Sequence, residues 1–214
     1  MSQINKKVVL ITGCAGFIGS ALVMKFLSNN FMVLGIDNIN NYYDQSLKFL
    51  RLKKIESFLM RENEKWKFFQ ISLEDKESLK EIFSKYMPNI VINLAAQAGV
   101  RYSIENPSAY LNSNMIGFFN ILETSKDFEI DHFVYASSSS VYGTNVEYPF
   151  TEDQNVNSPL SFYAATKISN EVMAFSYSNV YKLPTTGLRF FTVYGPYGRP
   201  DMAYFKFTKL IEDN

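Results

Sequence analysis

The chain has little of the chemistry that disulfides and metal sites require. Its 214 residues include one cysteine, Cys14, and one histidine, His132. A lone cysteine excludes an internal disulfide and a cysteine-rich metal site, and a single histidine argues against a zinc centre. No apolar run approaches a membrane span and no signal-peptide hydrophobic region is visible, so we expect a cytoplasmic protein without a membrane anchor.

An excess of charge of one sign is also missing. Lys and Arg number 21, Asp and Glu also number 21, and no basic run exceeds a pair. Nucleic acid is therefore not predicted as a partner, because its phosphates require clustered basic residues. What the chain does have is 47% hydrophobic residues, enough to bury the core of one large domain or of one domain plus part of a second.

A glycine-rich turn follows the first apolar segment. Residues 8–12 predict a strand buried on both faces of a parallel sheet, and Gly13, Gly16 and Gly19 then lead into a helix. Glycines at such a turn let backbone N–H groups approach a pyrophosphate at the helix N-terminus. The spacing is GxxGxxG rather than the commoner GxGxxG, and three glycines by themselves also fit a simple tight turn.

An acidic residue supports the nucleotide interpretation. Residues 32–36 predict a second strand, which ends at Asp37. A carboxylate at this point suits a ribose diol and repels a 2′-phosphate, so the unit predicts NAD rather than NADP as cofactor.

Strands and helices alternate along the rest of the chain. Further strands are predicted over 67–71, 90–94, 132–136 and 183–190, with helices over 45–60, around 79–86, and over 107–126 and 161–181. This order predicts an α/β fold with a doubly wound parallel sheet, in which ligands bind beyond the carboxyl ends of the strands. Small residues Ala95 and Ala96, before Gln97, permit close approach of a flat ligand there. The basic helix 45–60 is interpreted as a solvated cover.

The residues that carry chemistry lie between 133 and 167. An apolar strand ends in Ser137–Ser140, and Tyr163 and Lys167 follow with the i, i+4 spacing that places both on one face of a helix. An ammonium beside a phenol favours the phenolate, so we expect Tyr163 to be a general base assisted by a serine hydroxyl. Chance alone gives about one such Tyr–Lys pair in a chain of this composition, so the order of features carries the hypothesis.

Several segments resemble the extended short-chain dehydrogenase/reductase family, and within it the nucleotide-sugar 4-epimerases, especially those acting on UDP-glucuronate. They are residues 35–38, 41–44, 95–102, 136–143, 163–167, 189–196 and 198–202. The resemblance implies that Tyr163 is the base, that Lys167 orients it and that Ser138 is its hydroxyl partner. It further implies a homodimer that converts UDP-glucuronate to UDP-galacturonate through a 4-keto sugar. The cofactor-binding residues are then expected to be Gly13, Gly16, Phe17, Ile18, Gly19, Asp37, Asn38, Leu94, Ala95, Ala96, Gln97, Asn114, Tyr163 and Lys167.

The serine run separates related activities. Nucleotide-sugar dehydratases place an Asp-Glu pair after the hydroxyl residue, and UDP-glucuronate decarboxylases usually place a Glu at the second of these positions. This chain has Ser139 and Ser140 there. Thr192 stands where broader sugar epimerases have Asn, and with Arg199 it fits recognition of a sugar carboxylate. Arg199 also fits a surface residue in a loop. Ser138, Ser139, Ser140, Thr192 and Arg199 are therefore the expected substrate-binding residues.

Two departures from the family keep alternatives open. Ser72 stands where the family has an Asp that contacts adenine, and family members continue well beyond residue 214. We therefore expect a NAD-binding domain over 1–195, followed over 196–214 by the start of an incomplete substrate-binding portion. A catalytically inactive NAD-binding or dimerisation module, or another nucleotide-sugar oxidoreductase, are the competing hypotheses. For the dimer, the helices 107–126 and 161–181 offer the apolar residues Phe118, Phe119, Ile121, Leu122, Met173, Phe175 and Tyr177.

Overall fold

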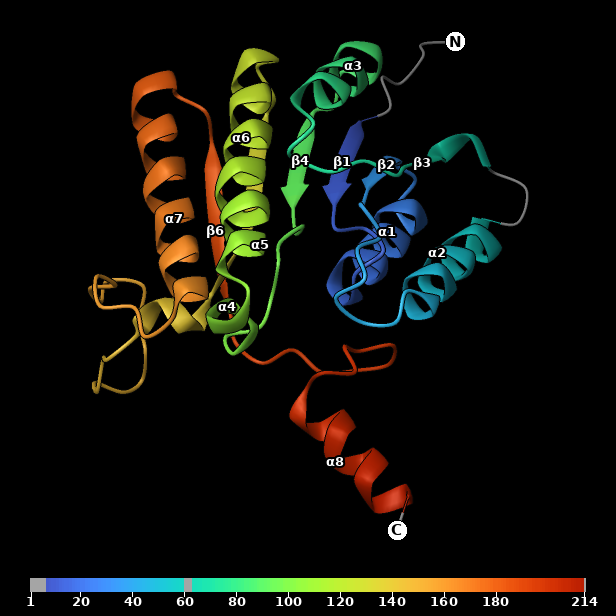
Figure 1. Ribbon diagram of the computed structural model, residues 1–214. Helices are drawn as coiled ribbons and strands as arrows, with labels where there is room; N and C mark the ends of the chain where they lie inside the picture. The colour runs from blue at the N-terminus through green and yellow to red at the C-terminus, as the bar shows by residue number, and fades with distance from the viewer. Residues whose placement is uncertain (1–6, 60–62, 214) are drawn as a thin grey trace.

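Six parallel strands form one sheet at the centre of the protein (Figure 1). The computed structural model describes residues 7–59 and 63–213. The strands are β1 (Val8–Thr12), β2 (Met32–Ile36), β3 (Trp66–Phe69), β4 (Ile90–Asn93), β5 (His132–Ser138) and β6 (Thr185–Phe190), in the spatial order β3-β2-β1-β4-β5-β6. The order reverses between β1 and β4, which confirms the predicted doubly wound sheet.

Successive strand residues face opposite sides of the sheet, so apolar side chains project from both faces, and helices cover each face. On one face, α1 (Phe17–Ser28) and α2 (Ser46–Leu59) pack over a core that includes Val9 and Ile11. On the other, α3 (Lys76–Tyr86), α6 (Phe118–Asp127) and α7 (Phe162–Tyr181) pack over a core that includes Leu10 and Phe133. Within the described ranges no helix is long and apolar enough to cross a membrane.

The helix expected over 107–126 is not uniform. Asn106 caps its start, with the side chain accepting from Ala109 N at 3.3 Å and Pro107 in the first turn. The segment then divides into α5 (Pro107–Tyr110), the π-helical η2 (Leu111–Gly117) and α6. A short helix that was not predicted, α4 (Tyr102–Glu105), precedes this segment. Two 3₁₀ turns are also present, η1 (Asn63–Lys65) before β3 and η3 (Ser139–Tyr142) after β5.

Two expectations about α2 and the strand boundaries are corrected. α2 is not simply a solvated cover, because Lys48, Arg51, Leu52, Ile55 and Leu59 are buried; Met60 lies outside the described residues. β5 runs two residues further than predicted, to Ser138, because Ser137 and Ser138 pair with Arg189 and Phe190 of β6. β3 ends at Phe69 instead of residue 71, and β6 starts at Thr185 instead of 183.

The last helix stands apart from the layers. α8 (Ala203–Glu212) follows an irregular segment after β6 and has no buried residue. Figure 1 shows it projecting beyond the carboxyl ends of the strands, away from the sheet. Phe207, Leu210 and Ile211 on this helix are 63%, 60% and 77% exposed.

Candidate active site

A cavity of about 510 Å³ opens at the carboxyl ends of the strands, within the size range of small-molecule sites. It runs from the turn after β1 to the N-terminus of α7. Almost every residue expected from the sequence lines it: Gly13, Gly16, Phe17, Ile18, Gly19, Asp37, Asn38, Leu94, Ala95, Ala96, Gln97, Ser138, Ser139, Ser140, Tyr163, Lys167, Thr192 and Arg199. Asn114 is the exception.

The turn between β1 and α1 is packed so closely that it requires glycine. Gly13 has a φ of +68°, which favours glycine, and a Cβ there would lie 2.8 Å from Ala95 N. A Cβ on Gly19 would lie 2.1 Å from the Gly13 carbonyl oxygen. The backbone of α1 therefore begins directly against the turn, and its first N–H groups have no side-chain cap to occupy them. This is the geometry that a phosphate group requires.

Asp37, at the end of β2, is 7% exposed and already engaged. Its carboxylate accepts from Ala15 N at 3.1 Å and from Ile39 N at 2.9 Å. Lys48 of α2, 5% exposed, places its ammonium 3.7 Å from the same carboxylate. Burial lowers the pKa of Lys48, while Asp37 opposes that shift. Lys48 lines the cavity and sequence reasoning missed it, because charge on a basic helix does not show which cation turns inward.

Ser72, where the family has an acidic residue, sits beside another carboxylate. Its hydroxyl bonds to the side chain of Glu74, and Asn38 Nδ2 donates to Ser72 Oγ at 3.4 Å. Ser72 and Glu74 both line the cavity. A carboxylate is therefore present at this wall, two residues along from the expected position.

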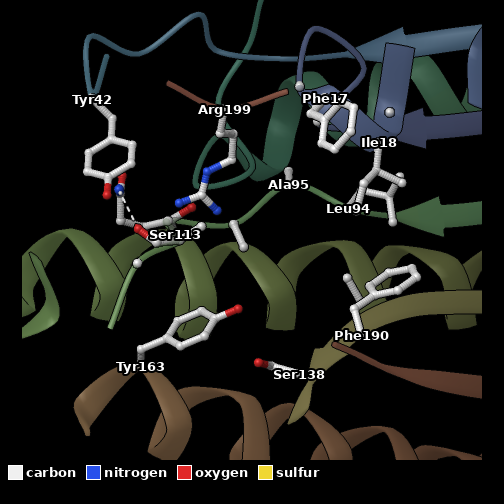
Figure 2. Close-up of a pocket in the computed structure, with 18 of the residues that line it drawn as sticks. Phe17, Ile18, Tyr42, Leu94, Ala95, Ser113, Ser138, Tyr163, Phe190 and Arg199 are labelled. Atoms are coloured by element: carbon white, nitrogen blue, oxygen red, sulfur yellow. Dashed lines mark hydrogen bonds between the residues drawn. The ribbon is translucent and has the colours of Figure 1, made fainter. Parts of the chain in front are cut away.

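The end of β5 brings the hydroxyl residues to the N-terminus of α7. Ser161 caps this helix by accepting from Ala164 N at 3.0 Å, so Tyr163 lies in the first turn. Figure 2 shows the Tyr163 and Ser138 side chains turned toward each other, with Arg199 on the opposite wall. Burial raises the pKa of Tyr163, whereas the Ser138 hydroxyl and the Arg199 charge act to lower it. The predicted lowering of this pKa is thus not found in the chain on its own.

Lys167 does not act on the phenol as expected. Its ammonium donates to the Ala136 carbonyl oxygen at 2.8 Å and lies 5.9 Å from the centre of the Tyr163 ring. Lys167 is 4% exposed, and burial lowers its pKa to about 8. The ammonium is thus bonded to β5 at the wall of the cavity, and the groups that act to lower the pKa of Tyr163 are Ser138 and Arg199.

Asn114 does not line the cavity but bonds to Gln97, which does. Its amide accepts from Gln97 N at 2.8 Å and donates to Gln97 O at 3.0 Å and Thr166 Oγ1 at 3.1 Å. Asn170 Nδ2 in turn donates to the Asn114 carbonyl oxygen at 2.7 Å. The π-helical segment sets this side chain between the loop after β4 and α7. Asn114 therefore holds the wall that Gln97 lines, a role that its place in a predicted uniform helix did not reveal.

Arg199 points into the cavity but has a partner of its own. Its Nε donates to Asp201 Oδ1 at 3.0 Å and a terminal nitrogen donates to Oδ2 at 2.5 Å. Tyr42, another cavity residue that the sequence did not single out, donates to Asp201 Oδ2 at 3.3 Å. A guanidinium has five N–H donors, so the ion pair leaves others for a ligand. Thr192 also lines the cavity.

Fold and site together define the class of extended short-chain dehydrogenases/reductases: a Rossmann-type sheet, a glycine turn, an acid after β2, and Ser138, Tyr163 and Lys167 in one cavity. A family model described as GDP-mannose 4,6 dehydratase matches residues 10–214. The chain belongs to the family that this model describes.

Individual relatives agree with the class. Protein CapI of Staphylococcus aureus is 57% identical over 203 residues, covering 95% of this chain and 59% of the relative. UDP-glucuronate 4-epimerase of Thermodesulfobacterium geofontis is 46% identical over 202 residues, covering 94% and 61%. The crystal structure of UDP-glucuronic acid 4-epimerase from Bacillus cereus, in complex with UDP-glucuronic acid and NAD, matches with a TM-score of 0.87 and 33% identity, covering 97% of this chain and 64% of that one. The chain thus spans about three fifths of the length of these proteins.

Proposed function

We propose that the chain carries the NAD-binding and proton-transferring part of a UDP-sugar 4-epimerase that interconverts UDP-glucuronate and UDP-galacturonate. The observation that carries the proposal is the pairing of Tyr163 and Ser138 across one end of the cavity, with the glycine turn at the other end (Figure 2). The names of the relatives and the ligands of the Bacillus cereus structure support the same activity.

The cofactor end of the cavity fits NAD on physical grounds. The uncapped N-terminus of α1 and the close-packed Gly13 and Gly19 leave room for a pyrophosphate and none for side chains. Asp37 would hold the adenosine ribose, and Asn38 and Glu74 line the wall next to it. Ala95, Ala96 and Lys167 would line the path toward the nicotinamide.

The chain's own residues have to move one proton and hold the sugar. When bound, NAD would supply a reversible hydride acceptor for sugar C4 and the positive charge of its nicotinamide ring. Tyr163 Oη takes the C4 hydroxyl proton and returns it, Ser138 Oγ bonds to the same oxygen, and Lys167 holds the end of β5 in register with α7. Because burial raises the pKa of Tyr163, the base form depends on the positive charges around it.

The cavity lacks the groups that elimination of water requires. Among its lining residues within the described chain, the carboxylates are Asp37 and Glu74, both at the cofactor end. Ser139 and Ser140 stand beside Ser138 instead of an acid pair. Removal of a hydroxyl from C6 needs a positioned acid and base, so this geometry favours epimerisation over dehydration.

A uronate is proposed as the sugar because the cavity offers partners for a carboxylate. Arg199 retains N–H donors beyond those that Asp201 takes, and it faces the end of the cavity where Tyr163 lies. Thr192 and Ser140 line the space nearby and offer hydroxyls. Guanidinium and hydroxyl groups are natural partners for a carboxylate.

The state of the cofactor and one exchange assay test the function. Purified protein is expected to bind NAD that is never consumed, and a longer protein with the C-terminal portion is expected to exchange UDP-glucuronate and UDP-galacturonate. Stoichiometric NADH release would instead indicate a net oxidoreductase. Binding of NAD without exchange in the longer protein would indicate an inactive NAD-binding module.

We also propose a homodimer and a boundary at residue 196. Of the apolar residues expected at the dimer interface, Phe118, Ile121 and Leu122 are buried in the chain's own core and are not available. Phe119 and Phe175 are 41% and 72% exposed and remain candidates. Light scattering that shows a monomer at high micromolar concentration would contradict the dimer. Residues 196–214, which include the unburied α8, are proposed as the beginning of the substrate-binding portion.

A further inference from the structure

Arg51 is a buried cation with an unusual set of partners. It lies on α2 and is 1% exposed. Its Nε and one terminal nitrogen donate to the Tyr197 carbonyl oxygen at 3.1 and 2.7 Å, and the same nitrogen approaches the Gly198 carbonyl oxygen at 3.4 Å. The other terminal nitrogen donates to the Ala15 carbonyl oxygen at 3.0 Å and to Tyr43 Oη at 2.6 Å.

These partners belong to two parts of the molecule that the sequence keeps far apart. Ala15 lies inside the glycine turn, and its N–H is held by Asp37, so Arg51 and Asp37 together fix both sides of this residue. Tyr197 and Gly198 immediately precede Arg199. Among the described residues no carboxylate lies within ion-pair distance of Arg51, so its charge is balanced by backbone dipoles and the phenol of Tyr43.

The segment that Arg51 holds includes a residue in an unfavourable backbone conformation. Tyr197 has a φ of +62°, in the left-handed region that is unfavourable for a residue with a side chain. Its carbonyl is the one that accepts two hydrogen bonds from Arg51. One turn further along α2, Lys54 places its ammonium 4.2 Å from the centre of the Tyr197 ring. α2 therefore supports Tyr197 at its backbone and at its ring.

We propose that Arg51 is a positioning residue that couples the glycine turn to the segment 197–199, an inference that rests on the proposed NAD site. The turn that holds the cofactor then also sets the position of Arg199, and an ordered turn means an ordered substrate-side loop. Lysine cannot replace Arg51, because one ammonium cannot span acceptors on both segments.

Hydrogen–deuterium exchange on this chain, with and without NAD, tests the coupling. In Arg51→Lys, amide exchange over 195–202 is expected to rise at least about tenfold, with a smaller rise over 13–17 and none in β4 or β5. In the wild type, NAD is expected to slow exchange in both segments, whereas in Arg51→Lys it slows only 13–19. Lys53→Gln, an exposed position on the same helix, is the matched control and should behave as wild type.

Three results distinguish the possibilities. Unchanged exchange over 195–202 in Arg51→Lys, or equal protection of both segments by NAD in wild type and variant, would overturn the inference. If Arg51→Lys raises exchange everywhere, Tyr43→Phe decides: loss of one acceptor should raise exchange about twofold in the two segments alone, and no rise would overturn the proposal. Absence of NAD protection over 13–19 in the wild type would contradict the proposed NAD site. The comparison of exchange over 195–202 between wild type and Arg51→Lys, made without NAD, would then still test the role of Arg51.

Discussion

The two ends of the cavity differ in how fully the chain covers the strands beside them. In β1, beside the glycine turn, Val9, Leu10 and Ile11 are completely buried, with helices packed on both faces of the sheet. In β6, Leu188 is 39% exposed, and beyond it Phe191 and Tyr194 are 58% and 80% exposed. The cofactor end is therefore built on a self-supporting core, whereas the substrate end depends on a few polar contacts, among them those of Arg51 and the Tyr42–Asp201 bond. We expect the cofactor end to fold and bind NAD even where the substrate end is incomplete.

The largest effect is expected on the epimerisation rate when Tyr163 is changed, with NAD affinity preserved. In a longer protein that carries this chain, Tyr163→Phe should lower the epimerisation rate by a factor of about 10² to 10⁴, because the phenolate oxygen that takes the C4 hydroxyl proton is lost. NAD affinity should stay near the wild-type value, measured by calorimetry. Near-parental turnover in this variant would remove Tyr163 from its assigned role.

A change in the glycine turn should damage the self-supporting end. Gly19→Ala places a Cβ 2.1 Å from the Gly13 carbonyl oxygen, so backbone must move. We expect the free energy of unfolding to fall by about 3 kcal/mol, measured by urea denaturation, with loss of NAD binding. Gly16→Ala is the matched control: the new Cβ lies 2.9 Å from the same oxygen, and a smaller loss is expected. Equal stability of Gly19→Ala and wild type would show that the turn is loosely packed.

A pH series tests the burial of Lys167. Burial lowers its pKa to about 8 in the folded protein. Below this pH both states bind the proton and the penalty for a buried ammonium is fully present. As the pH rises from about 8 toward 10.4, the folded state loses its proton before the unfolded one, so stability should rise relative to Lys167→Met. Between pH 7.5 and 10 the difference between the two proteins should change by about 2 kcal/mol, measured by urea denaturation at pH 7.5, 9 and 10. A pH-independent difference would indicate that Lys167 is hydrated.

The smallest effect is expected at the substrate end. Arg199 and Asp201 form an ion pair whose side chains are 25% and 26% exposed. Asp201→Asn should lower the free energy of unfolding by less than about 1 kcal/mol, because partly solvated ion pairs contribute little. NAD affinity should not change. A loss comparable to that of Gly19→Ala would mean that this ion pair stabilises the fold as strongly as the packing of the glycine turn does, and would break the comparison.

Features with a periodic or local signal were predictable from the sequence. The six strands, the glycine turn, Asp37 and the extent of α7 follow from apolar runs and turn residues, and the structure places them as expected. The boundaries of β3 and β6 shifted by two residues, since where pairing stops depends on the neighbouring strand and not on composition.

What could not be predicted depends on direction in space. Nothing local shows that Lys48 and Arg51 turn inward from a basic helix, because their partners lie in other segments. The pKa of Tyr163 was expected to fall from its spacing to Lys167, but burial, which spacing does not encode, dominates. The supporting role of Asn114 likewise depends on hydrogen bonds to Gln97 and Thr166, which lie in other segments.

Calorimetric titration of the 214-residue chain, first with NAD and then with UDP-glucuronate, tests the central claim most directly. We predict stoichiometric NAD binding, followed by little or no heat from UDP-glucuronate and no measurable epimerisation. The nucleotide part of a UDP-sugar normally provides the binding energy that orients the sugar, and in this chain the substrate end of the cavity is only partly covered. Absence of NAD binding would contradict the self-supporting cofactor end. Micromolar binding of UDP-glucuronate with turnover would contradict the dependence of the substrate end on further contacts.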